Sequence, residues 1–419
     1  MGAHALGRYS LGVGDRFAHE GEAQLAAFVA AARLGIDVTP VWNKSNREHL
    51  VVGSEPVSVR EEADAAVRAL DWRAPYFVDA DHVTAETVER FLEPCDFFTL
   101  DVAAAIGRPA ATEAVEAFCA RHGELAGDVA VAGLDAPVAM SREATARAAR
   151  HYLDAVAEAG RLYRLVAARR GAGTFLTEVS MDETDAPQAP AELLVILAAL
   201  ADEGIPVQTV APRFSGRFNK GVDYVGDVGG FAVELAADIA VVRHAAGAYG
   251  LPADLKLSVH SGSDKFSIFP VIRDAVRRAG AGVHVKTSGT TWLEEVIGLA
   301  EAGGDGLAVV QDVYAEAWRR REELCAPYAS VIDIDPAGLP TPAEVHGWDA
   351  VRFVAAVRHD PTDPAYDRQV RQLMHVGYKV AAEMGDRYTE LLLACRASIA
   401  RNVTENILER HLRPLFIDR

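Results

Sequence analysis

The chain is poor in the features that mark secreted proteins and membrane proteins. Only four cysteines occur in 419 residues, at positions 95, 119, 325 and 395, and none forms a CxxC pair. This spacing is typical of a reducing compartment and excludes a zinc site made of cysteines alone. No run approaches the roughly 18 apolar residues of a membrane span, and Met1–Ser10 has no apolar signal-peptide core. We therefore expect a cytoplasmic protein.

Basic residues are also scarce relative to acidic ones. Lys and Arg number 42 against 60 Asp and Glu, which gives a net charge of −18. Nucleic acid and anionic membrane surfaces both require a positive field, so neither is an expected partner. A small anionic substrate needs only a local basic pocket and stays open.

Half of the residues are hydrophobic, and they recur in short strand-like runs separated by helical patterns. Strands that alternate with helices predict a parallel sheet with right-handed crossovers. Eight strands would close a (β/α)8 TIM-like barrel. No GxGxxG follows the first strand, which weakens the competing doubly wound open sheet. The predicted strands are Ser10–Gly14, Val38–Trp42, Tyr76–Asp81, Phe97–Asp101, Phe175–Met181, Val207–Phe214, Lys256–His260 and Val283–Lys286.

The barrel is predicted to carry two helical additions. A helical insertion at about 102–174 contains a long helix over Ser141–Arg170, and residues 1–335 otherwise form the α/β barrel. Residues 336–419 form a helical C-terminal extension packed on the barrel, with helices over Asp367–Met384 and Asp386–His411. These helices are long enough to form an interface, so a homo-oligomer is possible. The further predicted helices are Glu61–Leu70, Ala85–Leu92, Ala191–Glu203, Phe231–Ala246 and Leu293–Ala302.

Charged and polar residues gather where the predicted strands end. In a parallel barrel the carboxyl ends of the strands form the active face. Charged groups are costly to bury unless they are paired or bind a metal, so their convergence predicts a polar cavity. In chain order these residues are Asp15, Arg16, Asp79, Asp81, His82, Asp101, Glu178, Asp182, Glu183, Arg213, His260 and Lys286.

Two of these residues have a purely structural alternative to weigh, and a third does not. Asp81 could be the N-cap of the next helix, and His260 could be a core histidine bonded to backbone. Glu178 is harder to explain in this way, because it stands inside the apolar run Phe175–Met181. A functional role for Glu178 is therefore favoured.

Two histidines on different strands with nearby oxygens suit a divalent cation. His82 and His260 are the candidate pair, although no HExxH motif is present. Such ligands suit zinc, nickel, manganese or iron. Basic side chains could clamp a carboxylate or a phosphate, and the candidates are Arg16, Arg213, Lys220, Lys265 and Lys286. The residues alone indicate a metal-assisted acid/base enzyme acting on a small anionic, hydroxylated substrate.

At these same positions the chain resembles the tagaturonate/fructuronate epimerase family. DADH, EVSMDET and HSGSDKF, in this order, are together highly specific, whereas each alone would be weak. The resembling stretches run over almost the whole chain: Ser10–Arg16, Val78–His82, Phe97–Asp101, Glu178–Thr184, Pro212–Phe214, Lys220–Tyr224, Leu257–Phe266, Gly282–Gly289 and Val370–His375.

The resemblance implies a metal-dependent epimerase that interconverts D-tagaturonate and D-fructuronate. It implies that Asp81 is the proton acceptor and Glu178 the proton donor. It also implies His82 and His260 as metal ligands, and we place a third ligand at Asn219. The predicted substrate contacts are Asp15, Arg16, Asp101, Arg213, Lys220, Ser261, Asp264, Lys265 and Lys286.

The two ketohexuronates differ at a carbon one position beyond the α-carbon of the ketone. The carbonyl does not acidify the proton on that carbon, so a simple enolate route cannot invert it. A retro-aldol route can, and a divalent cation would stabilise the enediolate. Two alternatives remain open: a metal-dependent aldolase of a sugar acid, and a non-catalytic sugar-acid binding protein.

Overall fold

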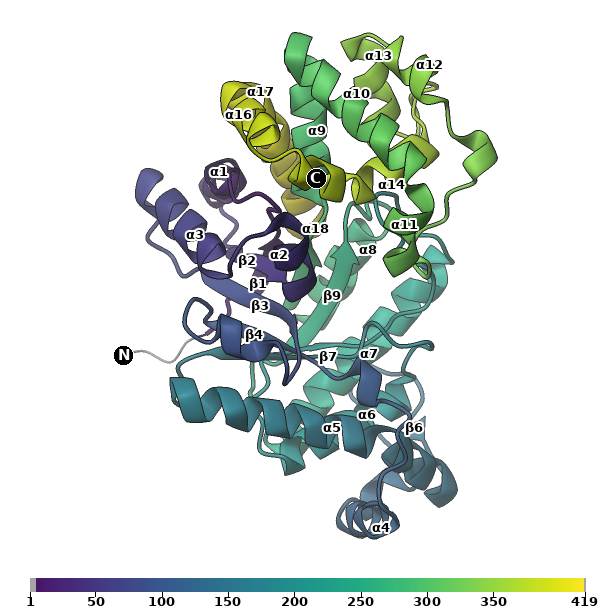
Figure 1. The fold of residues 1–419 in the computed structure, drawn as a ribbon. Coiled ribbons are helices and arrows are strands. Elements are labelled where there is room, and N and C mark those ends of the chain that lie inside the picture. Colours follow the sequence, from purple (N-terminus) through teal and green to yellow (C-terminus); the bar gives the residue numbers. More distant parts are fainter. Residues whose placement is uncertain (1–4, 418–419) are drawn as a thin grey trace.

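The computed structural model describes residues 5–417, in which eight parallel strands close into a barrel (Figure 1). The order around the barrel is β1-β10-β9-β8-β7-β4-β3-β2. All eight predicted strands and the predicted TIM-like barrel are therefore confirmed. Their bounds are Tyr9–Val13 (β1), Thr39–Ser45 (β2), Phe77–Val83 (β3), Phe97–Asp101 (β4), Leu176–Ser180 (β7), Thr209–Ala211 (β8), Lys256–Gly262 (β9) and Val283–Thr287 (β10).

The inside of the barrel changes from apolar to polar along the strands. A small apolar cluster forms a core of its own, made of Leu6, Val41, Phe77, Phe97 and Leu176. Side chains two residues apart on a strand face the same side. Two residues further along each strand, the interior face therefore carries Asn43, Asp79, Thr99 and Glu178. The apolar cluster thus closes the amino end, and chemistry is confined to the carboxyl end.

Helices cover the outside of the barrel between consecutive strands (Figure 1). The crossover helices are α1 (Gly21–Arg33), α3 (Val57–Ala69), α5 (Arg142–Arg170), α6 (Pro190–Asp202), α7 (Val228–Tyr249) and α8 (Phe269–Ala279). A shorter α2 (Asn46–Val52) follows β2 directly.

The helix predicted over Ala85–Leu92 is wrong. Only a 3-10 turn, Val88–Phe91, forms between β3 and β4. The backbone N–H of Thr84 donates to Oγ1 of Thr87 at 3.0 Å, and the N–H of Thr87 donates to the carbonyl of Thr84. Such local bonds offer the backbone an alternative to a regular helix start.

The long helix α5 packs on β4 and on α6, so it is the crossover between β4 and β7. Before it lie α4 (Thr112–Arg121) and the two-residue strands β5 (Asp128–Val129) and β6 (Val138–Ala139). Figure 1 shows α4 and β6 at the end of the molecule opposite α12 and α13. We therefore propose that the inserted part of the predicted 102–174 segment is about 102–141.

The chain after β10 leaves the barrel and returns to it. Helix α9 (Thr290–Ala302) is buried by α10 (Gly304–Arg319), α13 (Ala350–Val357) and α17 (Arg396–Glu405). The chain end then packs beside the barrel helices, with α17 against α1 and α18 (Arg413–Phe416) against α8. The extension thus takes the place beside α1 and α8 that the helix after the last strand occupies in a simple barrel.

The two long helices predicted in this extension are each broken. The first is α14 (Arg368–Val376) and α15 (Tyr378–Glu383), which meet at Gly377. A Cβ at Gly377 would lie 3.1 Å from a side chain of α10, so a larger residue would need that side chain to shift by a few tenths of an ångström. The second is α16 (Asp386–Ala394), α17 and a π-helical segment, Asn406–Leu412. The remaining short helices are α11 (Arg321–Cys325) and α12 (Pro342–His346). No helix within residues 5–417 has the length and apolarity needed to cross a membrane.

A buried ion pair connects the extension to the barrel. Nη2 of Arg371 lies 2.7 Å from Oδ2 of Asp264, and neither side chain is exposed. The same guanidinium donates to the backbone carbonyls of Gly221 and Val357. Arg371 on α14 therefore holds the loop after β9 and the loop after β8 together.

Substituting Arg371 by Met should lower the free energy of unfolding by about 3–5 kcal/mol, because it removes the permanent cation from the buried Asp264 carboxylate and leaves it only Thr290 and two histidines as partners. Urea denaturation followed by circular dichroism measures the change. The matched control is Arg161→Met, which removes an exposed ion pair with Glu158 and should cost less than about 1 kcal/mol. Equal losses in the two variants would contradict a structural role for this pair.

Candidate active site

A cavity of about 630 Å³ lies at the carboxyl ends of the strands. Its walls come from the loops after β1, β2, β3, β4, β7, β8, β9 and β10. The segment after α11, just before the 336–419 extension, adds Pro327, Tyr328, Ser330 and Val331. The cavity wall therefore combines the barrel loops with chain that follows β10.

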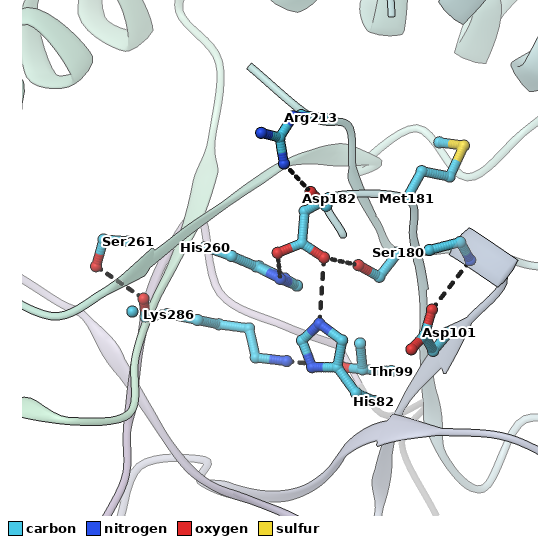
Figure 2. Close-up of polar contacts among 12 residues, drawn as sticks. His82, Thr99, Asp101, Ser180, Met181, Asp182, Arg213, His260, Ser261 and Lys286 are labelled. Atoms are coloured by element: carbon cyan, nitrogen blue, oxygen red, sulfur yellow. Dashed lines mark hydrogen bonds and ion pairs between the residues drawn. The ribbon is translucent and has the colours of Figure 1, made fainter. Parts of the chain in front are cut away.

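Two histidines and one aspartate point at one another in this cavity (Figure 2). Nε2 of His82 lies 3.2 Å from Oδ1 of Asp182, and Nδ1 of His260 lies 3.1 Å from Oδ2. The pairing of β3 with β4 shifts in register between Ala80 and Val83, and His82 has a φ of 51°. Non-glycine residues rarely adopt this left-handed conformation, and such strain concentrates at functional sites.

Each histidine also contacts a carboxylate through its other ring nitrogen. Nδ1 of His82 lies 2.9 Å from Oδ1 of Asp81. Nε2 of His260 lies 2.8 Å from Oε1 of Glu178. Histidines that bind metals usually donate their second N–H to a carboxylate, which fixes the ring. Both predicted catalytic carboxylates therefore hold a histidine of the cluster.

This arrangement fits a divalent cation. One ligand atom from each of His82, Asp182 and His260 lies within 4.8 Å of the other two. Nδ1 of His260 is buried, and its 3.1 Å contact with Oδ2 of Asp182 lacks hydrogen-bond geometry. Two imidazoles and a carboxylate are a suitable donor set for a first-row transition metal. Arg213 helps to fix the loop, since its Nη1 donates to the backbone carbonyl of Asp182 at 3.1 Å.

Asp182 was a polar candidate in the sequence but not a predicted ligand. Its position two residues beyond the inward-facing Ser180 was the available signal, and Ser180 Oγ donates to its Oδ1 at 2.6 Å. The predicted third ligand, Asn219, is fully buried with both amide atoms unpartnered, and it does not line the cavity. The structure thus brings Asp182, rather than Asn219, to the two histidines.

The ammonium of Lys286 lies among three carboxylates beneath the histidines. Nζ is 2.6 Å from Oδ2 of Asp79, 2.6 Å from Oδ1 of Asp81 and 3.3 Å from Oε1 of Glu178. Oγ1 of Thr99 lies 2.8 Å from the same Nζ. Lys286 was predicted to contact substrate, and it does line the cavity. Its main contacts, however, are with the acid/base candidates.

Burial and charge act in opposite directions on these groups. Burial would raise the pKa of Asp81 and of Glu178, but Lys286 and the adjoining histidine hold both pKa values well below the ordinary range. Burial raises the pKa of Asp79 to about 6 despite the nearby lysine. Burial lowers the pKa of His260, but Asp182 and Glu178 bring it to about 9. Asp81 and Glu178 are therefore ionised at neutral pH.

Asp81 and Glu178 differ in their access to the cavity. Asp81 lines the cavity, whereas Glu178 is fully buried one layer below it. Glu178 contacts the cavity only through its neighbours His260 and Lys286, and Oγ1 of Thr209 donates to its Oε2 at 2.7 Å.

The predicted substrate contacts divide into two groups. Five of them line the cavity, namely Arg16, Asp101, Arg213, Lys220 and Lys286. Four do not, namely Asp15, Ser261, Asp264 and Lys265.

The second group is occupied by bonds within the fold. The Asp15 carboxylate accepts four backbone N–H groups of residues 17–20 before α1. Oγ of Ser261 donates to the backbone carbonyl of Lys286 at 2.8 Å, away from the histidines (Figure 2). Asp264 pairs with Arg371, and Nζ of Lys265 donates to Oγ of Ser263 at 3.0 Å. These four residues therefore stabilise the fold, and most of the HSGSDKF motif, which contains three of them, is structural.

Comparisons with known proteins agree on one family. A family model described as tagaturonate epimerase matches residues 3–412. The tagaturonate/fructuronate epimerase of Thermotoga maritima is 30% identical over 227 residues, which is 54% of this chain and 41% of that protein. The aligned region thus spans less than half the length of this relative.

Solved structures of the same description share the fold. The glycerol-complexed fructuronate-tagaturonate epimerase of Cohnella laeviribosi has a TM-score of 0.81 at 24% identity, over 99% of this chain and 82% of that chain. The native structure of that protein has a TM-score of 0.79 at the same identity and coverage. These structures support the barrel with its C-terminal extension.

Proposed function

Because the chain belongs to the tagaturonate epimerase family, we propose that it is a carbohydrate epimerase that interconverts D-tagaturonate and D-fructuronate. The observation that carries the proposal is the paired arrangement of His82 with Asp81 and of His260 with Glu178 around Asp182. It provides acid/base groups and a cation site at one point of the cavity.

In the proposed reaction, Asp81 removes the proton from the hydroxyl on the carbon that is to be inverted. The bond between that carbon and the α-carbon of the ketone then breaks, which gives an aldehyde fragment and an enediolate. The aldehyde rotates so that its opposite face meets the enediolate. The same carbon–carbon bond then forms again, and the new alkoxide receives a proton. Positioned acids and bases of this kind contribute about 10²- to 10⁴-fold to a rate.

Glu178 is the proposed proton donor on the return step. It is ionised at the start and has no surface in the cavity, so we propose that it first receives, through Lys286, the proton that Asp81 has taken. Glu178 then returns this proton to the new alkoxide by way of Lys286. The ammonium of Lys286 contacts both Asp81 and Glu178 and itself lines the cavity. The same contacts let the two carboxylates exchange roles in the reverse direction.

His82, Asp182 and His260 would hold the divalent cation, with Asp81 and Glu178 orienting the two imidazoles. When bound, such a cation supplies Lewis-acid stabilisation of the charge that develops on the ketone oxygen. The small-molecule partner is a sugar acid, and Arg16, Asp101, Arg213 and Lys220 are the proposed contacts that line the cavity.

NMR of the purified protein with D-tagaturonate and a divalent metal should show D-fructuronate accumulating to an equilibrium mixture. The same mixture should form from D-fructuronate, because an epimerase accelerates both directions. Free three-carbon products would instead indicate an aldolase. The absence of any epimer across a panel of ketohexuronates, neutral ketoses and divalent metals would contradict the proposed function.

A further inference from the structure

Most acidic and basic residues of the cavity wall occupy different halves, and Glu48 after β2 is an exception beside the basic half. Asp81, Asp101 and Asp182 follow β3, β4 and β7, which are neighbours in the barrel. Arg16 and Lys220 come from the loops after β1 and β8, in the half that also contains β9 and β10. A ligand with a negative group at one end would therefore be oriented by the field of the cavity.

Arg16 is a buried cation, and part of its guanidinium has no hydrogen-bond partner. Its side chain is only 4% exposed, and its single ion pair with a described residue is a 3.3 Å contact from Nε to Glu48. Nη1 is buried and has no partner. The guanidinium lies over the ring of Tyr378, 3.9 Å from the centroid. Unpaired polar atoms are costly to bury, so an anion is the expected missing partner.

Tyr378 makes this arrangement a contribution of the C-terminal extension. It begins α15, and its hydroxyl lies 3.0 Å from the hydroxyl of Tyr328, which lines the cavity. The two tyrosines therefore form a platform that fixes the plane of the Arg16 guanidinium. A planar guanidinium held in place suits bidentate recognition of a carboxylate.

Lys220 supplies a second cation near the end of β9. Its Nζ lies 3.3 Å from the position that a Cβ on Gly262 would take, so glycine leaves room for the ammonium. Within residues 5–417, its ammonium makes no ion pair with a carboxylate. Lys220 and Arg16 also act on the same neighbour, His375, whose pKa is well below the ordinary value because of burial and then these cations. In the described part of the chain these two cations have one carboxylate partner between them, Glu48 at Nε of Arg16, so this side of the cavity keeps unmatched positive charge.

The spacing also suits a six-carbon acid. Gly262 is two residues beyond His260 on β9, and a strand rises about 3.3 Å per residue, so the two positions are about 7 Å apart. In a ketohexuronate, four carbon–carbon bonds of about 1.5 Å separate the ketone carbon from the carboxylate carbon. A substrate with its ketone at the histidines can therefore bring its carboxylate to Lys220.

We propose that Arg16 and Lys220 form a carboxylate subsite that selects sugar acids over neutral ketoses, and that Tyr378 of the extension positions Arg16 in it. This inference rests on the proposed function, since it assigns the acid end of the substrate of the same cavity. It makes Arg16 and Lys220 specificity residues, separate from the acid/base groups on β3 and β7.

The test compares D-tagaturonate with the neutral ketose D-tagatose as substrates. Arg16→Gln and Lys220→Met should each raise KM for the acid about 10- to 100-fold, the range expected for lost hydrogen bonds to a charged group. They should change kcat only a few-fold and leave KM for D-tagatose unchanged. Arg16→Lys keeps the charge but loses the fork, so its effect on the acid should be smaller. The matched control is Arg217→Gln, which removes an exposed cation of the same cavity wall.

Two results would overturn the subsite. One is an equal loss for acid and neutral substrates, and the other is a loss in Arg217→Gln as large as in Arg16→Gln. If the wild-type protein turns over neither substrate, the proposed function fails, and calorimetry of D-tagaturonate binding then decides the subsite. Binding by the wild type that is weakened in both substituted proteins supports it, and no binding, or binding unchanged by the substitutions, contradicts it.

Discussion

Replacing Asp81 by Asn should lower kcat for ketohexuronate epimerisation about 10²- to 10⁴-fold, because the variant lacks the group that takes the hydroxyl proton. The amide is similar in size and can still contact Lys286 and His82, so we expect the fold to be retained. Steady-state kinetics at saturating substrate and metal measure the change. The control is Asp185→Asn, which neutralises an exposed acid of the same cavity wall.

Asp81 also orients His82, and this second role must be separated from the first. Loss of a carboxylate that only orients a metal-binding histidine typically costs about 10- to 100-fold in metal affinity or activity. If excess divalent metal restores the activity of Asp81→Asn, the residue is a positioning residue and the assignment as proton acceptor is wrong. A loss of kcat that persists with metal fully bound supports the acid/base role.

Glu178→Gln gives the complementary result. Glu178 is buried below the cavity, so its effect should appear in kcat with little change in KM. If its proton travels by way of Lys286, Lys286→Met should lower kcat by a similar factor, and the double substitution should cost little more than either one. Residues that act as a unit are non-additive in this way. Additive losses would contradict the shared route.

The fold was predictable because its strands have a simple pattern. Most barrel strands are buried on both faces and contain a short apolar run, and eight strands permit closure of a barrel. The polar layer was predictable for the same reason, since Glu178 interrupts such a run. The break at Gly377 was not predicted, and the side chain of α10 that approaches this glycine lies more than sixty positions earlier in the chain.

Which polar residues face the cavity depends on tertiary packing. Asp264 was a reasonable substrate contact from its motif, but its partner Arg371 is 107 residues away and belongs to the extension. Conversely, Asp182 joins the histidines because the loop after β7 turns back over the barrel, where Arg213 binds its backbone carbonyl. The spacing of residues within one motif does not predict the contact of Asp264 with Arg371 or that of Arg213 with Asp182, because each joins separate parts of the chain.

Removing bound divalent metal with a chelator should abolish epimerase activity, and adding the metal back should restore it. His82→Ala and His260→Ala should each prevent restoration at metal concentrations that suffice for the wild type, because each removes one of the three donor groups at the proposed site. Elemental analysis of the purified protein provides a readout independent of activity, with about one metal ion per chain expected. His346→Ala is the matched control, since this histidine is exposed on α12, outside the cavity.

The Asp182→Asn variant distinguishes the structural assignment from the sequence-based one. If Asp182 is the third donor, its substitution should weaken metal binding as much as loss of either histidine, whereas Asn219→Ala should leave the metal content unchanged. The reverse result would mean that the loop after β8 rearranges to bring Asn219 to the cation. Activity that survives complete removal of metal would show that the three side chains serve only as a hydrogen-bonded cluster, and that the charge on the ketone oxygen is stabilised by the cationic side chains of the cavity.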